Sequence, residues 1–248
     1  SSAIYSAEAT TLEQAQQLKL HTICQRLQLS RSDHLLEIGS GWGGLAIYAA
    51  NHFGCKVTTT TISDAQYDYA AQTIKNHGLE DKITLLKQDY RDLTGKYDKL
   101  VSIEMIEAVG HQYFDTFFRQ CDSLLKDGGK MLIQAITIAD QRYTSYIRNV
   151  DFIRHFIFPG GCLPSISVLS HQISKNSQMV IEQLDDIGLH YAKTVADWRS
   201  RFDHNWPQLQ LLGYDDRFRR LWHYYLCYCE GAFLQRATSA VQLVARKL

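Results

Sequence analysis

Apolar and polar positions along the first half of the chain alternate between two patterns. Short apolar runs predict strands, and apolar residues repeating every third or fourth position predict helices between them. The expected strands are 34–38, 55–62, 83–87, 99–103 and 130–138, and the expected helices are 11–27, 42–52, 63–78 and 113–125. Strict alternation with short connections indicates an α/β fold with a doubly wound, mostly parallel sheet.

The pattern changes after residue 138. Residues 139–177 form a long segment, rich in aromatic residues, that contains Phe158-Pro-Gly-Gly161. A segment of this length inside a compact domain is usually functional. Beyond it lie two more expected strands and two helices, at 179–184, 240–245, 191–205 and 216–235. We therefore expect a single domain over residues 1–248, with seven strands and an insertion of about 139–177.

Composition excludes several classes of protein. The 26 Lys and Arg residues balance 26 Asp and Glu residues, so nothing favours nucleic acid as a partner. The six cysteines include no Cys-x-x-Cys pair, and we expect no metal site. No apolar run approaches the length of a membrane span, and reduced cysteines fit a cytoplasmic protein. The chain begins at Ser1 rather than Met, and we expect it to be a fragment or trimmed.

The segment His34–Gly44, HLLEIGSGWGG, carries the clearest chemical signal. An apolar strand ends in the acid Glu37, and three closely spaced glycines lead directly into a helix. Glycines let the backbone approach a ligand closely, and a helix N-terminus presents free N–H groups. A dinucleotide site has the spacing G-x-G-x-x-G and an acid after the next strand, whereas the next strand here ends in threonines. The pattern favours S-adenosylmethionine, and a tight turn with no ligand is the alternative.

Two acids, Glu104 and Glu107, follow the fourth predicted strand. In a doubly wound sheet, ligands bind beyond the carboxyl ends of the first and fourth strands. We therefore expect Glu107 to face the pocket near the glycine turn, where it can hold or act as a proton acceptor. The alternative interpretation of Glu107 is an ordinary acid exposed to solvent. Glu104 lies one helical turn away and can have a structural role.

Six separated segments carry a resemblance to a known family. They are Thr11-Leu-Glu-x-Ala-Gln16, Glu37-Ile-Gly-Ser-Gly-Trp-Gly-Gly44, Thr61-Ile-Ser-x-x-Gln66, Gln88-Asp-Tyr-Arg-Asp-Leu93, Phe158-Pro-Gly-Gly-Cys-Leu-Pro-Ser165 and His190-Tyr-Ala-Lys-Thr194. On these segments the chain resembles the cyclopropane fatty acid synthases, which include the mycolic acid cyclopropane synthases. The resemblance implies a Rossmann-like class I methyltransferase fold with a lipid-pocket insertion, and it implies that the family's N-terminal capping segment is missing here.

The resemblance also implies a reaction and a cofactor. S-adenosylmethionine would donate a methylene group to the cis double bond of an unsaturated phospholipid acyl chain, and a base would remove a proton so that a cyclopropane ring closes. Methyl transfer to the double bond leaves a carbocation on the acyl chain. Because water would react with this carbocation, the pocket must be dry and apolar, and aromatic ring faces can stabilise the positive charge. The implied cofactor-binding residues are Ser1, Gly39, Ser40, Gly41, Thr61, Ile62, Ser63, Gln66, Tyr90 and Arg91.

The base implied by the family is a bound bicarbonate. Its matching ligands here are Glu107, Ile136 and Tyr191, while Ser2 replaces the family's cysteine and Gln134 its histidine. Serine and glutamine can still donate hydrogen bonds to an anion. The two changes put the bicarbonate geometry in question and leave a methylene or methyl-branched product open.

Cys229 matches a family cysteine implicated in activity. It shares a helical stripe with Phe218, Trp222 and Tyr225, which predicts one buried face. Since the reaction needs no thiol nucleophile, we interpret Cys229 as part of the pocket wall.

Arg217, Arg219 and Arg220 precede an aromatic run, with Arg236 further along the same predicted helix. Basic and aromatic residues together suit an anionic lipid surface, although a solvated helix face has the same pattern. The family resemblance adds the expectation of a cytoplasmic protein peripheral to the membrane, and a homodimer stays open.

Two other function classes stay open. A methyltransferase acting on oxygen or nitrogen of a small molecule would need an acid or histidine over a polar acceptor, whereas the insertion and the C-terminal helices look apolar and aromatic. A non-catalytic cofactor- or lipid-binding protein would be expected to have a damaged glycine turn, and the turn here is intact.

Overall fold

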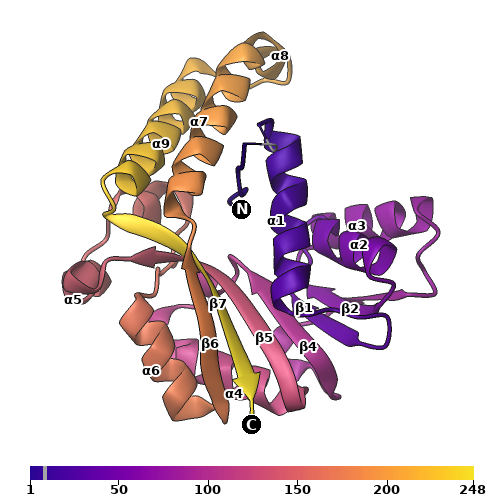
Figure 1. Cartoon of the computed structure of the whole chain (residues 1–248). Helices are drawn as coiled ribbons and strands as arrows, with labels where there is room; N and C mark the ends of the chain where they lie inside the picture. The colour runs from indigo at the N-terminus through magenta and orange to yellow at the C-terminus, as the bar shows by residue number, and fades with distance from the viewer. Residues whose placement is uncertain (8–9) are drawn as a thin grey trace.

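The computed structural model describes residues 1–7 and 10–248. Within them, seven strands form one sheet in the order β3-β2-β1-β4-β5-β7-β6 (Figure 1). The strands are β1 His34–Ile38, β2 Lys56–Thr61, β3 Ile83–Lys87, β4 Tyr97–Ile103, β5 Leu125–Ile138, β6 Met179–Asp186 and β7 Thr238–Lys247. β7 lies between β5 and β6 and is antiparallel to both, while β1 to β5 pair in parallel. The predicted doubly wound, mostly parallel sheet is confirmed.

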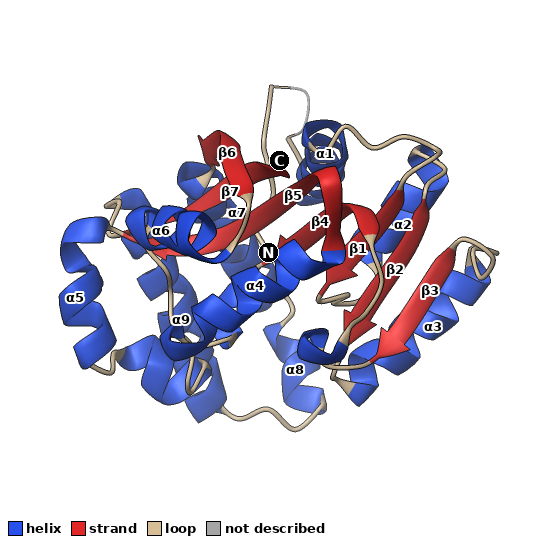
Figure 2. Cartoon of the chain, turned by 90° about the horizontal axis from the view of Figure 1, so that it is seen from below, coloured by secondary structure: helices blue, strands red, loops and turns tan. Residues whose placement is uncertain are grey.

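Helices cover both faces of the sheet (Figure 2). They are α1 Leu12–Arg26, α2 Gly44–His52 and α3 Asp64–Asn76 on one face, and α4 Phe114–Leu124 and α6 Ile166–Asn176 on the other. Because successive side chains of a strand point to opposite faces of the sheet, one strand contributes side chains to the hydrophobic core on each face. Leu36 packs in the same cluster as Phe117 of α4, and its neighbour Leu35 packs in the cluster of Ala49 of α2.

A helical layer stands beyond the carboxyl ends of the parallel strands (Figure 1). It consists of α7 Gly188–His204, α8 Trp206–Leu211 and α9 Asp216–Leu234. The N-terminal residues lie between this layer and α1, where the Ile4 N–H donates to Ala15 O at 3.1 Å and the Ala3 N–H donates to Thr194 Oγ1 at 3.0 Å. These first residues therefore connect the helical layer to the sheet domain.

The predicted insertion divides into two parts. α5 (Asp140–Arg148) and a π-helical turn (Ile153–Ile157) lie off the sheet, whereas α6 packs against α4 and β6 as an ordinary crossover helix. Only residues 139–165 are therefore additional to the sheet architecture. Among the described residues, every helix is too short or too polar to cross a membrane.

Candidate active site

The glycine turn after β1 has the backbone that glycine favours. Gly39, Gly41 and Gly43 take φ values of 95°, 50° and 88°, in the left-handed region where a side chain is disfavoured. The N–H groups of Gly39 and Ser40 both donate to Thr60 O, at 3.1 and 2.8 Å. These bonds fasten the turn to the end of β2, and α2 begins immediately after it.

A cavity of about 480 Å³ lies at this edge of the sheet, within the usual size range of small-molecule sites. Seven predicted cofactor residues line it: Gly39, Thr61, Ile62, Ser63, Gln66, Tyr90 and Arg91. Eight further residues complete the lining: Ile38, Thr60, Gln88, Asp89, Met105, Ala108, Val109 and Tyr113. The predicted motifs after β2 and β3 therefore meet at one pocket.

Local hydrogen bonds fix the polar groups of the pocket after β2. Thr61 Oγ1 donates to Gln66 Oε1 at 2.9 Å, and Ser63 Oγ caps α3 by accepting from the Gln66 N–H at 3.4 Å. Ser63 and Gln66 thus form only half of a capping box, because the Gln66 side chain bonds Thr61 rather than the backbone of Ser63.

On the opposite wall, Asp89 accepts from the backbone N–H, Nε and Nη2 of Arg91 at 2.9, 2.9 and 2.7 Å. Sequence reasoning did not select Asp89, although it stands inside the matched Gln88–Leu93 motif. The Asp89–Arg91 pair shapes the rim where Tyr90 enters the pocket.

Three predicted cofactor residues do not line the cavity. Ser40 is buried, with its hydroxyl on Gly41 O at 3.1 Å. A side chain at Gly41 would meet no atom within 4 Å. Ser1 lies beside α1, where its hydroxyl accepts from Lys19 Nζ at 3.0 Å.

The acids after β4 form the second part of the site. Glu104 Oε1 accepts from the Ser2 N–H at 3.0 Å and from Gln134 Nε2 at 2.8 Å, and Glu104 Oε2 accepts from the Tyr191 hydroxyl at 2.7 Å. Glu107 Oε1 accepts from the Ile136 N–H at 2.6 Å. Glu107 Oε2 is buried and has no hydrogen-bond partner among the described residues.

The structure thus gathers the five residues expected around an anion, but it arranges them around a different group. Ser2, Gln134 and Tyr191 direct their donors to Glu104, for which the sequence left a structural role open. Of these residues, Ile136 alone donates to Glu107, through its N–H. The position of Glu104 at the carboxyl end of the fourth strand was the signal that could have identified it.

Burial dominates the electrostatics of the site. It raises the pKa of Glu107 from 4.5 to about 8, with the nearby Glu104 carboxylate as the next cause. It also raises the pKa of Glu37 to about 8, although the Thr59 hydroxyl donates to Glu37 at 2.7 Å. Both acids therefore hold a proton at neutral pH. The pKa of Tyr191 lies well above 10 because the ring is buried and its hydroxyl faces Glu104.

Aromatic side chains of α9 and the insertion face one another. Phe152 contacts Tyr224 and Tyr228, with ring centroids 4.7 and 5.8 Å apart, and Phe158 contacts Tyr225 with ring centroids 6.3 Å apart. These contacts join two segments distant in sequence into one aromatic wall.

The predicted stripe of Phe218, Trp222, Tyr225 and Cys229 exists, but it is half-buried rather than buried. Burial of the sulfur raises the pKa of Cys229 to about 12, so the thiol carries no charge at neutral pH. An uncharged thiol is a poor nucleophile, which agrees with a place in a pocket wall.

The sheet order, the glycine turn and the pocket together define a class I S-adenosylmethionine-dependent methyltransferase. Within this class, the chain belongs to the family described as mycolic acid cyclopropane synthetase, whose sequence model matches residues 1–243.

Relatives of known sequence agree with this assignment. Cyclopropane-fatty-acyl-phospholipid synthase of Escherichia coli (strain K12) is 40% identical over 246 residues, covering 98% of this chain and 61% of the relative. Tuberculostearic acid methyltransferase UfaA1 of Mycobacterium tuberculosis is 36% identical over 224 residues, covering 90% of this chain and 52% of the relative. The chain thus spans between half and two thirds of these relatives' length.

A solved structure shares the fold over the whole chain. Mycolic acid cyclopropane synthase CmaA1, determined in complex with SAH and CTAB, superposes with a TM-score of 0.92 at 27% identity. The match covers 100% of this chain and 89% of that one.

Gly41→Val should weaken binding of S-adenosylhomocysteine at least about tenfold, equivalent to about 1.4 kcal/mol, because a branched side chain would occupy open space in the turn that begins with the cavity-lining Gly39. Gly78→Val is the matched control. Both glycines have positive φ, at 50° and 63°, and neither would place a Cβ within 4 Å of another atom, so the backbone strain is similar. Calorimetric titration should show unchanged affinity for Gly78→Val; equal affinities in the two folded variants would exclude the turn from the cofactor site.

Glu107→Gln should reduce the dependence of stability on pH. The pKa of Glu107 is about 8 in the folded protein and 4.5 in the unfolded chain. Between these pH values the unfolded chain has lost the Glu107 proton while the folded protein still holds it, so the wild type loses stability as the pH rises from 4.5 to 8. The amide cannot ionise, so Tm should fall less between pH 5 and pH 8 in this variant.

The exposed Asp127 provides a control for that measurement, since Asp127→Asn should follow the wild type. Glu37 contributes a slope of the same sign to all three proteins and cancels in the comparison. Identical pH profiles of Tm for Glu107→Gln and the wild type would show that Glu107 is ionised in the folded protein.

Proposed function

We propose that the chain is the catalytic part of an enzyme that uses S-adenosylmethionine to convert the cis double bond of an unsaturated phospholipid acyl chain into a cyclopropane ring. The proposal rests on one observation: the acids Glu104 and Glu107 lie directly beside a pocket of the size of a cofactor site. Met105, between Glu104 and Glu107, lines the pocket and lies against Gly39, where an added Cβ would be 3.3 Å from Met105 Cγ. A proton acceptor therefore stands at the edge of the cofactor site.

The chemistry accounts for the residues around this pair. S-adenosylmethionine, when bound, supplies an electrophilic methyl group on a sulfonium. The chain must then hold the alkene beside it, exclude water and accept one proton from the transferred carbon. The buried rings of Tyr191, which bonds Glu104, and of Phe233, stacked on it with ring centroids 4.4 Å apart, suit the first two tasks, because ring faces can stabilise a cation without reacting with it. The acid pair suits the third.

A different product is the second candidate. One relative is named a tuberculostearic acid methyltransferase, at 36% identity, and the site residues Ser2 and Gln134 depart from the family's pattern. A methylene or methyl-branched acyl chain would arise from the same first step. A polar small-molecule acceptor finds less support, since the aromatic residues Tyr191 and Tyr225 lie beside the acids.

Labelled methyl groups test the reaction. The full-length protein, incubated with methyl-labelled S-adenosylmethionine and vesicles of an unsaturated phospholipid, should place label in the acyl chains, and mass spectrometry should find one added CH₂ per double bond. Vesicles of the saturated phospholipid serve as the control and should stay unlabelled. Label that reaches only protein or small-molecule acceptors would overturn the proposal.

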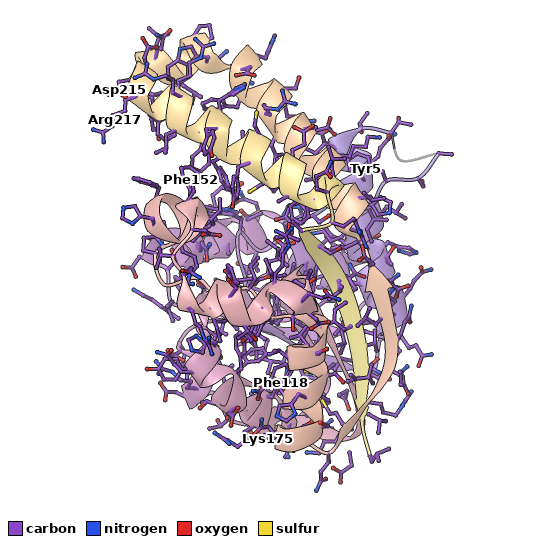
Figure 3. All side chains as sticks on the ribbon, turned by 90° about the vertical axis from the view of Figure 1, so that its left-hand side faces the viewer. Tyr5, Phe118, Phe152, Lys175, Asp215 and Arg217 are labelled. Carbon is purple, nitrogen blue, oxygen red and sulfur yellow. The ribbon has the colours of Figure 1, made fainter. Side chains whose placement is uncertain are left out.

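We further propose that the tip between α8 and α9 contacts the membrane surface that holds this substrate. Leu211, Leu212 and Tyr214 are 88%, 75% and 45% exposed there, and Arg217 and Arg220 are exposed on the first turn of α9. Figure 3 shows Arg217 at the far end of that helix. Exposed apolar side chains beside cations match an anionic lipid surface.

The other two arginines of the predicted basic cluster have partners in the protein. Arg219 stacks over Trp206, 5.3 Å from the ring centroid, and Arg236 pairs with Asp186 at the opposite end of α9. Cytoplasmic location and homodimer formation stay predictions.

Replacing Leu211 and Leu212 together by serine should weaken binding to phosphatidylglycerol vesicles at least about tenfold, because each leucine buried in lipid contributes about 1.5–3 kcal/mol. Vesicle sedimentation measures this. Val180→Ser on the exposed edge strand β6 is the control and should bind as the wild type does. Unchanged binding of the double variant would exclude the tip as the membrane contact.

A further inference from the structure

The donors of the active site converge on a side chain of the protein itself. The Ser2 N–H, the Gln134 amide and the Tyr191 hydroxyl come from the N-terminal segment, β5 and α7, and all three donate to the Glu104 carboxylate within 3.0 Å. The side chain of Glu104 is 11% exposed. Its φ of 49° is unusual for a residue with a side chain, so the fold tolerates backbone strain at the position that directs this carboxylate into the site.

Hydrogen bonds on the side of Gln134 away from Glu104 fix the orientation of the Gln134 amide. Arg26 of α1 pairs with Asp185 at 3.1 Å and donates to Gln242 Oε1, which turns the Gln242 NH₂ group towards Gln134. Gln242 Nε2 donates to Gln134 Oε1 at 2.8 Å. Gln134 must therefore present its own NH₂ group to Glu104, and it can offer that carboxylate a donor but no competing acceptor.

These contacts leave a bicarbonate ion without its binding site. The ion would need the Ser2, Gln134 and Tyr191 donors that the Glu104 carboxylate already occupies. It would also bring a further negative charge against two acids in a buried site, which is unfavourable. The family's bicarbonate therefore does not fit this arrangement, and no step of the reaction is derived through it.

We propose that Glu104 is the proton acceptor of the reaction and replaces an external anion. This inference rests on the proposed function. The alkene uses its π electrons to bond the methyl carbon, whose bond to sulfur breaks with the electron pair left on sulfur, and the adjacent acyl carbon becomes cationic. Glu104 then takes a proton from the added carbon, and the released C–H electron pair closes the ring on the cationic carbon. The proton passes from Glu104 to water before the next turnover.

The neighbouring acid is unsuited to this role at neutral pH. Burial raises the pKa of Glu107 to about 8, so that carboxyl already carries a proton, and its Oε1 is taken by the Ile136 N–H. Of the two acids after β4, Glu104 is the one held by donors from three separate elements, which leaves it as the acceptor.

The proposal is tested by removing the Glu104 carboxylate by mutation and then adding a small anion from solution to replace it. Glu104→Gly deletes the acid and suits the positive φ, so the variant should fold. Its turnover on unsaturated phospholipid vesicles should fall at least about 100-fold, as expected for loss of a positioned base, and added formate or bicarbonate should restore it. Glu104→Gln is the matched control: it fills the same space, accepts no proton, and should stay inactive with either anion.

Three further measurements test whether Glu104 acts as a base or only as a structural residue. Formate should raise the Tm of Glu104→Gly but not that of the wild type or Glu104→Gln, because only the glycine variant has room for the anion. Affinity for S-adenosylhomocysteine should be equal in all three proteins. Wild-type turnover should be the same in bicarbonate-depleted buffer with and without added bicarbonate.

Three results would overturn the proposal: full turnover of Glu104→Gly without an anion, a wild type that requires bicarbonate, or a glycine variant that stays inactive with both anions. A wild type that alkylates no acyl chain would overturn the proposed function instead. In that case the Tm of Glu104→Gly in formate still decides whether Glu104 fills the place of an anion.

Discussion

The hydrogen bonds to the Glu104 carboxylate are the constraint on which the active site depends. They bring the N-terminal segment, β5 and α7 to one buried point. Removing this acceptor would leave three enclosed donors unsatisfied, which typically costs about 1–3 kcal/mol for each group. The helical layer is thus positioned over the sheet by the same contacts that hold the Glu104 carboxylate.

The parallel sheet supplies the other half of the arrangement. β1 and β4 are neighbours, with Leu36 opposite Leu100, so the glycine turn and the acids leave the sheet at the same edge. The buried Glu37, one register step further and bonded to Thr59, ties β1 to β2 just below the pocket. One edge of the sheet therefore holds both a small-molecule cavity and the two acids that follow β4.

The sequence predicted elements whose cause is local. The strands β1 to β5 and the glycine turn follow from apolar runs and backbone conformation, and they lie within a few residues of the expected places. The helix α5 was not predicted, because it buries no residue and so carries no apolar pattern. The role of Glu104 was missed for a different reason: its partners come from residues 2, 134 and 191, and no spacing along the chain encodes that meeting.

The position of β7 has a consequence for synthesis of the protein. This strand follows β6 in sequence, yet it lies between β5 and β6 in the sheet and supplies Gln242, which orients the Gln134 amide. A nascent chain on the ribosome that still lacks Thr238–Lys247 has no partner for the open edge of β5 and an unoriented Gln134. Pairing across about 100 residues of sequence is slow to form. A nascent chain can therefore orient the Gln134 amide only after β7 has left the ribosome and paired with β5.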